Sequence, residues 1–264
     1  MSKINEQAGW KEKWWIPYRV LARLRMMLSP ETIHVGPFGE RYHINHYSFV
    51  ERMIKQGQFE NQRAAYVHDH LKPEDVFVDI GANIGFFTVI AAKCGAMVYA
   101  FEPEEGNYRR LLRNLKLNGL DEARVKTYSC ALGSETGQAV LHRSLTDNYG
   151  RVSLVSEHSP DGLSVPVRRL DDILTSFASR HVVKVDVEGA EVQVLDGALG
   201  AIGKMPPGSV WLVEIHVGVG VQVAAVVERF TRFGYRISFL DDATGKLMAE
   251  APPNQDVLLV AERV

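Results

Sequence analysis

The chain has 264 residues, 46% of them hydrophobic, and a formal net charge of −2. A chain of this length and hydrophobic content can bury one sizeable core, so we expect an α/β main domain over residues 57–264 and an N-terminal extension over residues 1–56. The charge is too small for a chain-wide attraction to nucleic acid, and no apolar stretch is long enough to span a bilayer. Cys94 and Cys130 lack metal-ligand spacing, which indicates reduced thiols and a cytoplasmic protein.

The segment from Trp10 to Leu28 combines basic and aromatic side chains and is expected to be helical. Such a helix could lie on an anionic membrane surface. It could also pack Trp14 and Trp15 on the main domain or on a second subunit, in a homodimer, and this arrangement requires no membrane. We favour packing on protein.

From Val76 onward apolar runs alternate with helical patterns, which predicts a mostly parallel sheet with helices on both faces. The expected strands span residues 76–80, 97–102, 124–129, 182–187, 210–215, 236–240 and 257–262. The expected helices span residues 86–93, 105–117, 192–199 and 222–233. Residues 137–170 are expected to form a β-hairpin insertion with an exposed tip at 147–153, which either closes over a ligand or is a plain surface loop.

The first of these strands leads into a turn bracketed by Gly81 and Gly85 and then into a helix. Such a turn directs backbone N–H groups and the positive end of a helix dipole at one point, which suits a polar cofactor. The dinucleotide fingerprint needs glycine at two further places, where this chain has Asn83 and Phe86, so nicotinamide and flavin cofactors are disfavoured. Glu102, at the end of the next strand, is placed to accept hydrogen bonds from both hydroxyls of an adenosine ribose.

Three blocks of sequence together resemble the FkbM-type S-adenosylmethionine-dependent methyltransferases. They are residues 79–85 (DIGANIG), residues 101–103 (FEP) and residues 184–191 (KVDVEGAE). The resemblance implies a Rossmann-like, class I methyltransferase sheet of seven strands, mostly parallel with the last strand antiparallel, carrying the helical extension and the hairpin insertion. It also implies an O-methyltransferase that uses S-adenosylmethionine on a hydroxyl of a sugar, glycan or natural-product-like small molecule.

The predicted site residues stand at or after the carboxyl ends of strands, where ligands bind in open α/β sheets. Those expected to bind the cofactor are Asp79, Gly81, Asn83, Gly85, Thr88, Glu102, Pro103, Cys130, Ala131 and Asp186. For Thr88, packing in the first turn of its helix is the alternative to a cofactor contact.

A hydroxyl acceptor also needs a base, and the candidates are His216, Asp186 and Glu188. An unperturbed histidine titrates near neutral pH, and His216 is expected to point into the cleft unless it only caps the following helix. Glu191 stands at the start of a predicted helix, and its side chain is expected to accept hydrogen bonds from the first backbone amides of that helix.

A magnesium ion held by Asp186, Glu214 and His216 is the alternative to metal-free base catalysis, by analogy with catechol-type methyltransferases. Because histidine is an unusual ligand for magnesium, metal-free catalysis is favoured. Two other functions stay open from sequence: a methyltransferase of RNA or protein, and a non-catalytic protein that binds S-adenosylmethionine or serves as a scaffold.

Overall fold

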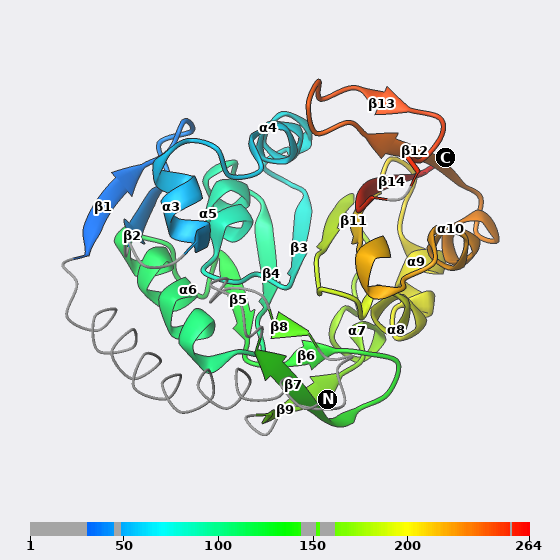
Figure 1. Ribbon diagram of the computed structural model, residues 1–264, viewed down its shortest axis with the longest axis horizontal. Helices are drawn as coiled ribbons and strands as arrows, with labels where there is room; N and C mark the ends of the chain where they lie inside the picture. The colour runs from blue at the N-terminus through cyan, green and yellow to red at the C-terminus, as the bar shows by residue number, and fades with distance from the viewer. Residues whose placement is uncertain (1–30, 45–48, 144–151, 154–161, 254) are drawn as a thin grey trace, which may run out of the picture.

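The computed structural model describes residues 31–44, 49–143, 152–153, 162–253 and 255–264 (Figure 1). The predicted helix over residues 10–28 and most of the predicted loop tip lie outside the described residues. Among the described residues, no helix is both long and apolar enough to cross a membrane.

One sheet forms the centre of the molecule, and its strand order is β13-β12-β14-β11-β10-β3-β4-β5. Its strands are β3 (Val76–Ile80), β4 (Met97–Phe101), β5 (Val125–Tyr128), β10 (His181–Val185), β11 (Val210–Ile215), β12 (Tyr235–Leu240), β13 (Leu247–Met248) and β14 (Val257–Arg263). The strands from β5 to β11 pair in parallel, and β14 lies antiparallel between β11 and β12. The seven predicted strands and the antiparallel last strand are confirmed, and the short edge strand β13 is an addition that was not predicted.

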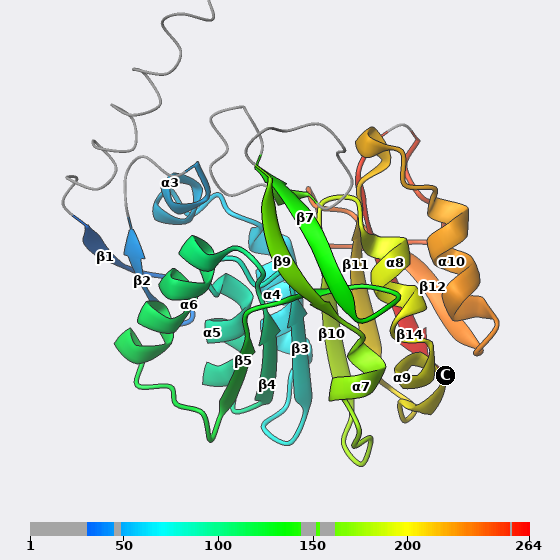
Figure 2. The same cartoon turned by 90° about the horizontal axis from the view of Figure 1, so that it is seen from below.

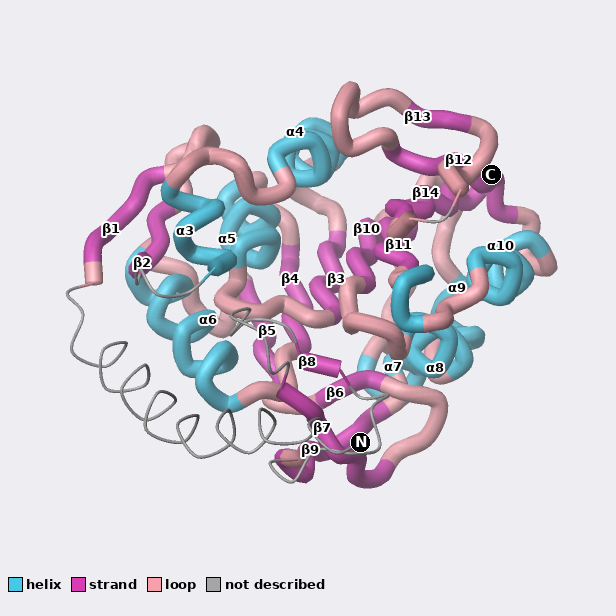
Figure 3. The backbone as a smooth tube through the Cα atoms, viewed as in Figure 1, coloured by secondary structure: helices cyan, strands magenta, loops and turns pink. Residues whose placement is uncertain are grey.

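Helices cover both faces of this sheet, as Figures 1 and 3 show. They are α3 (Phe49–Lys55), α4 (Asn61–His70), α5 (Phe86–Lys93), α6 (Glu105–Leu117), α7 (Leu170–Ile173), α8 (Glu191–Asp196), α9 (Leu199–Lys204) and α10 (Val223–Thr231). Because side chains alternate along a strand, neighbouring residues of β3 enter different cores: Phe77 packs with α4 and α5, and Val78 packs with α8 and α9.

The described part of the N-terminal extension is not wholly helical. Before α3 it contains an antiparallel hairpin of β1 (Thr32–Val35) and β2 (Arg41–Ile44), which the sequence pattern did not predict. The hairpin is fixed to α6, since Asn114 Oδ1 accepts from the His43 amide at 2.9 Å and Tyr42 is fully buried. The described hairpin of the extension therefore packs into the core of the main domain.

The predicted insertion is confirmed as a hairpin of β7 (Gly137–Arg143) and β9 (Leu163–Arg168), which pair antiparallel. Two short strands, β6 (Ala131–Leu132) and β8 (Val152–Ser153), complete a small sheet of order β6-β9-β7-β8. Figure 2 shows β7 and β9 running together as a twisted ribbon beside the central sheet. The insertion thereby places Leu141 in the wall of the cleft described next.

Candidate active site

A cleft opens at the carboxyl ends of β3, β4 and β10, and we call it the donor cleft. The chain runs from β3 outward to β5 and then returns to place β10 on the other side of β3, so the cleft lies at the point where strand order reverses. It contains about 600 Å³ of empty space, part of it open to solvent.

Eight of the predicted site residues line this donor cleft: Gly81, Asn83, Glu102, Pro103, Cys130, Ala131, Asp186 and Glu188. Sequence reasoning missed other lining residues, namely Ile80, Phe101, Asn107, Leu132, Leu141 and Val187. Most of these side chains are apolar and have no chemical signature. Phe101 and Val187 lie inside two of the sequence blocks quoted above, and Ile80 ends a predicted strand, so position was the available signal for these three.

The turn after β3 requires its glycines. Gly81 has φ 82°, and a Cβ at this position would lie 1.9 Å from the backbone oxygen of Asp186. Gly85 has φ 87°, and its Cβ would lie 2.4 Å from Leu111 Cδ1. Asn83 also adopts a left-handed conformation, with φ 51°. The turn therefore brings the end of β3 into direct contact with the segment after β10, where the acidic site residues lie.

Glu102 lines the donor cleft and is 5% exposed. Its Oε2 accepts from the Asn83 amide and its Oε1 from the Glu104 amide, both at 2.8 Å. Burial raises the pKa of Glu102 to about 7, although these backbone hydrogen bonds act in the opposite direction. A carboxylate has about four lone-pair sites, so each oxygen keeps capacity to accept from a ligand hydroxyl.

Three predicted cofactor residues do not line the donor cleft. Thr88 Oγ1 donates to Asp79 Oδ2 at 2.6 Å, and both side chains are fully buried beneath the turn. Gly85 is likewise absent from the cleft wall and begins α5 as its N-cap. In this structure Thr88 and Asp79 support the turn from below, which agrees with the packing alternative for Thr88.

Asp186 faces the donor cleft with a lysine beside it. Lys184 Nζ lies 3.0 Å from Asp186 Oδ2 and 4.9 Å from the centre of the Phe87 ring, and Lys184 is 6% exposed. Burial alone would raise the pKa of Asp186, but the charges of Lys184 and His216 outweigh it and hold that pKa below its usual value. An ionised, cation-paired carboxylate is a weak base, so Asp186 is better suited to accept hydrogen bonds.

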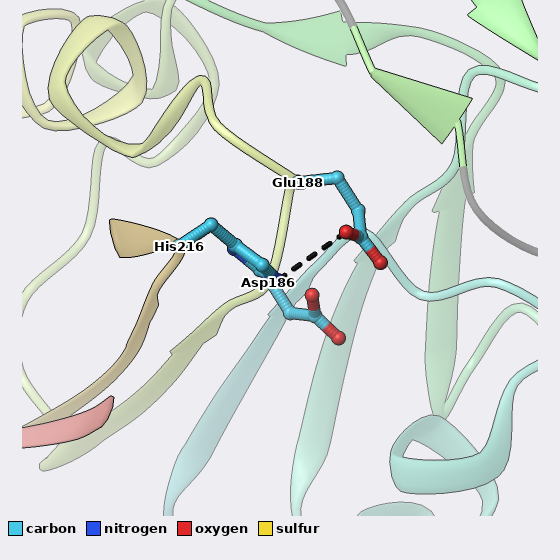
Figure 4. Close-up of side chains that lie close together, drawn as sticks. All are labelled: Asp186, Glu188 and His216. Carbon is cyan, nitrogen blue, oxygen red and sulfur yellow. Dashed lines mark ion pairs between the residues drawn. The ribbon is translucent and has the colours of Figure 1, made fainter. Parts of the chain in front are cut away.

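His216 lies beside Asp186 and Glu188, as Figure 4 shows. Its Nε2 is 3.3 Å from Glu188 Oε2 and 3.8 Å from Glu214 Oε1, and it forms no hydrogen bond. The ring is 2% exposed and does not line the donor cleft itself, which corrects the expectation that it points into the cleft. It makes no side-chain capping bond to the short 3₁₀ turn that follows, so the capping alternative is not supported.

The other ring nitrogen of His216 is held by Glu191. Its Nδ1 lies 2.6 Å from Glu191 Oε1, and because a carboxylate can only accept, Nδ1 carries the proton. Burial alone would lower the pKa of His216, but this hydrogen bond and the charges of Asp186, Glu214 and Glu188 raise it to about 9. Glu191 also accepts from the amide of Gly189, which precedes α8, and not from the first amides of the helix as the sequence predicted. Its contact with His216 was not predicted.

Two groups among the described residues have ligand atoms close enough to share a metal ion. One is Asp186, Glu188 and His216; the other is Glu60, Asp186 and Glu214. The three residues that the sequence suggested for magnesium thus fall into two groups that share only Asp186. Arg63 Nη1 also lies 2.5 Å from Glu214 Oε2, so the second group already has a positively charged side chain as a partner.

The sheet order, the switch-point cleft and the acidic strand ends together define an α/β fold of the class I methyltransferase type. A crystal structure of TYW2 from M. jannaschii in complex with AdoMet shares this fold, with a TM-score of 0.51 and 18% identity over 89% of this chain and 88% of that chain.

The family model for the methyltransferase FkbM domain matches residues 79–237, more than half of the chain. The chain therefore belongs to the FkbM methyltransferase family, which confirms the resemblance seen in the three sequence blocks.

Two curated relatives are similar over different shares of the chain. The hexuronic acid methyltransferase AglP of Haloferax volcanii is 28% identical over 72% of this chain and 76% of its own length. Methyltransferase 1 of Beauveria bassiana is 30% identical over 47% of this chain, and the match spans 59% of that protein.

Proposed function

We propose that the protein transfers a methyl group from S-adenosylmethionine to a hydroxyl group of a sugar, a glycan or a natural-product-like small molecule. The observation that carries this proposal is that one cleft combines the glycine turn, the Glu102 carboxylate and Asp186 with a buried histidine beside it. Membership of the FkbM family supports the transfer, and a relative named for its action on hexuronic acid supports a sugar acceptor.

The chemistry of the donor cleft fits the cofactor. The Glu102 carboxylate would accept from the ribose hydroxyls, since its backbone partners leave lone pairs free. Four other predicted cofactor residues line the same cleft: Cys130 and Ala131 would contact the adenine, and Gly81 and Asp186 would hold the amino-acid end. Bound here, S-adenosylmethionine supplies an electrophilic methyl group on a positively charged sulfur.

The chain's own contribution is to align the acceptor and to remove its proton. Alignment of two reactants can be worth about 7–11 kcal/mol, and a positioned base typically adds about 10²–10⁴-fold. We assign the base to His216 Nε2, which lies between Glu188 on the donor cleft and Glu214. As the new oxygen–carbon bond forms and the sulfur–carbon bond breaks, the hydroxyl proton passes to Nε2, and Glu191 holds the ring through Nδ1.

Glu102→Ala tests the cofactor site directly. A hydrogen bond to a charged group contributes about 1.5–3 kcal/mol, so the variant should bind S-adenosylmethionine roughly ten- to a hundred-fold more weakly in titration calorimetry. The matched control is Glu105→Ala, an exposed glutamate at the start of α6 whose partner is Arg109. Equal affinity of the two variants would remove Glu102 from the site, and failure of the unaltered protein to bind the cofactor would refute the proposed function.

A further inference from the structure

A second cleft adjoins the donor cleft at Asp186. It contains about 890 Å³ of empty space, part of it open to solvent. Two of its lining residues, Glu60 and Glu214, have carboxylate oxygens within 4.8 Å of those of Asp186. His216 Nε2 stands at the same junction, 3.8 Å from Glu214 Oε1. His216 lines neither cleft, so a molecule in the second cleft would approach the proposed base across Glu214, close to Asp186 on the donor cleft.

The wall of the second cleft is polar. It is formed by the amide side chains of Gln58, Asn61 and Gln62, by the carboxylates of Glu60, Glu214 and Asp242, and by Arg63. Amides both donate and accept hydrogen bonds, and carboxylates accept strongly from hydroxyl groups. None of these lining residues is aromatic, so the cleft offers many partners for hydroxyl groups and no flat apolar surface for an aromatic ring.

The one basic residue in this wall is already engaged by carboxylates. Arg63 Nε and Nη2 donate to the two oxygens of Asp242 at 2.9 and 2.8 Å, and Nη1 donates to Glu214 at 2.5 Å. Glu60 Oε2 lies a further 3.5 Å from Nη1. The guanidinium is 10% exposed and has no side left for a ligand carboxylate. Acidic side chains therefore outnumber basic ones across the wall.

One residue of this acidic wall, Glu60, has a strained backbone conformation. It has φ 44°, a left-handed conformation that residues other than glycine rarely adopt, and it directly precedes α4. Burial raises its pKa to about 7, although the charges of Lys184 and Arg63 act in the opposite direction. The carboxyl is held against its neighbours by the fold, as expected of a binding wall and not of a freely solvated surface.

We propose that the second cleft is the acceptor subsite and that it selects a polyhydroxylated acceptor, a sugar unit, that is neutral or carries an amine and bears no carboxylate. The inference rests on the proposed function, since it names the acceptor for the same transfer. The amide and carboxylate wall hydrogen-bonds sugar hydroxyls, and its surplus of acidic groups repels an anion. In this respect the protein differs from its relative that acts on hexuronic acid.

The charge of the methylated product tests this selection. An extract of the source cells is divided at pH 7 on an anion exchanger into a retained anionic pool and an unretained pool, and each pool is incubated with the protein and methyl-labelled S-adenosylmethionine. We expect at least about tenfold more label in the unretained pool than in the anionic pool. One unfavourable charge–charge interaction near a protein surface is sufficient for a ratio of this size. Label confined to the anionic pool would overturn the inference while leaving the methyl transfer itself established.

Substitutions of residues that line the second cleft provide a second, independent test of the inference. Gln58→Ala and Gln62→Ala should each raise the KM for the labelled acceptor several-fold without changing the affinity for S-adenosylmethionine. Gln193→Ala, an exposed glutamine on α8, is the matched control. Asp242→Asn removes one carboxylate from Arg63 and should increase label in the anionic pool. Wall variants that match the control in KM would overturn the inference, and cofactor binding without label in either pool would refute the proposed function and the inference with it.

Discussion

The contact between Glu191 and His216 leads to a prediction of how the reaction rate depends on pH. With its pKa raised to about 9, only roughly one His216 ring in a hundred is neutral at pH 7 and able to accept a proton. If His216 is the base, kcat/KM should rise about tenfold per pH unit from pH 7 and level off near pH 9.

Glu191→Gln perturbs this contact with little change of shape. The glutamine oxygen can still accept from Nδ1–H across the 2.6 Å contact, so the ring keeps its orientation and loses a neighbouring negative charge. A hydrogen bond to a charged group is worth about 1.5–3 kcal/mol, which corresponds to about one to two pKa units. The pKa of His216 should therefore fall by that amount from its raised value of about 9, and the neutral fraction at pH 7 should increase at least about tenfold.

The variant should consequently be faster than the unaltered protein at pH 7 and no faster at pH 10, where both rings are neutral. Initial rates with labelled S-adenosylmethionine across about pH 6 to 10 measure this profile, and an NMR titration of the His216 ring checks the pKa without catalysis. Glu228→Gln, an exposed glutamate on α10, is the matched control. If the profile of Glu191→Gln coincides with that of the control, the assignment of His216 as the base is wrong.

The remaining predictions concern the cofactor site, the metal question and the core. Because burial raises the pKa of Glu102 to about 7, affinity for S-adenosylmethionine should weaken up to about tenfold per pH unit below 7, and calorimetry on Glu102→Gln should show no such dependence. Activity should survive exhaustive chelation; a loss that magnesium restores would favour the metal mechanism. Asn114→Ala should lower the free energy of unfolding by about 2–4 kcal/mol in urea titrations, since it removes buried partners of Ile84 O and the His43 amide, and a loss under about 0.5 kcal/mol would contradict this.

Local sequence was sufficient to predict the strands that carry the donor cleft. The run from Val76 to Ile80 is apolar apart from Asp79 and is followed by a glycine turn. Both signals act over a few residues, so the strand and the turn follow without knowledge of the rest of the chain. The glycines are needed for a reason that sequence alone could not give, since at Gly81 the obstacle is the backbone of Asp186. Strand ends predicted the acidic residues of the cleft because parallel strands bring their carboxyl ends to one edge.

Other parts of the site depend on contacts between residues far apart in sequence. The hairpin before α3 has no strong alternation, and it is stabilised by its packing on α6. Arg63 meets Glu214 and Asp242 across separations of 151 and 179 residues, so no local pattern marks it as part of a wall. The sequence by itself determined the sheet, the glycine turn after β3 and the residue types at the strand ends. Only the tertiary structure decided that Glu191 holds His216 and that Arg63 is neutralised, because the pKa and the free hydrogen-bonding capacity of a side chain are set by the neighbours that folding brings to it.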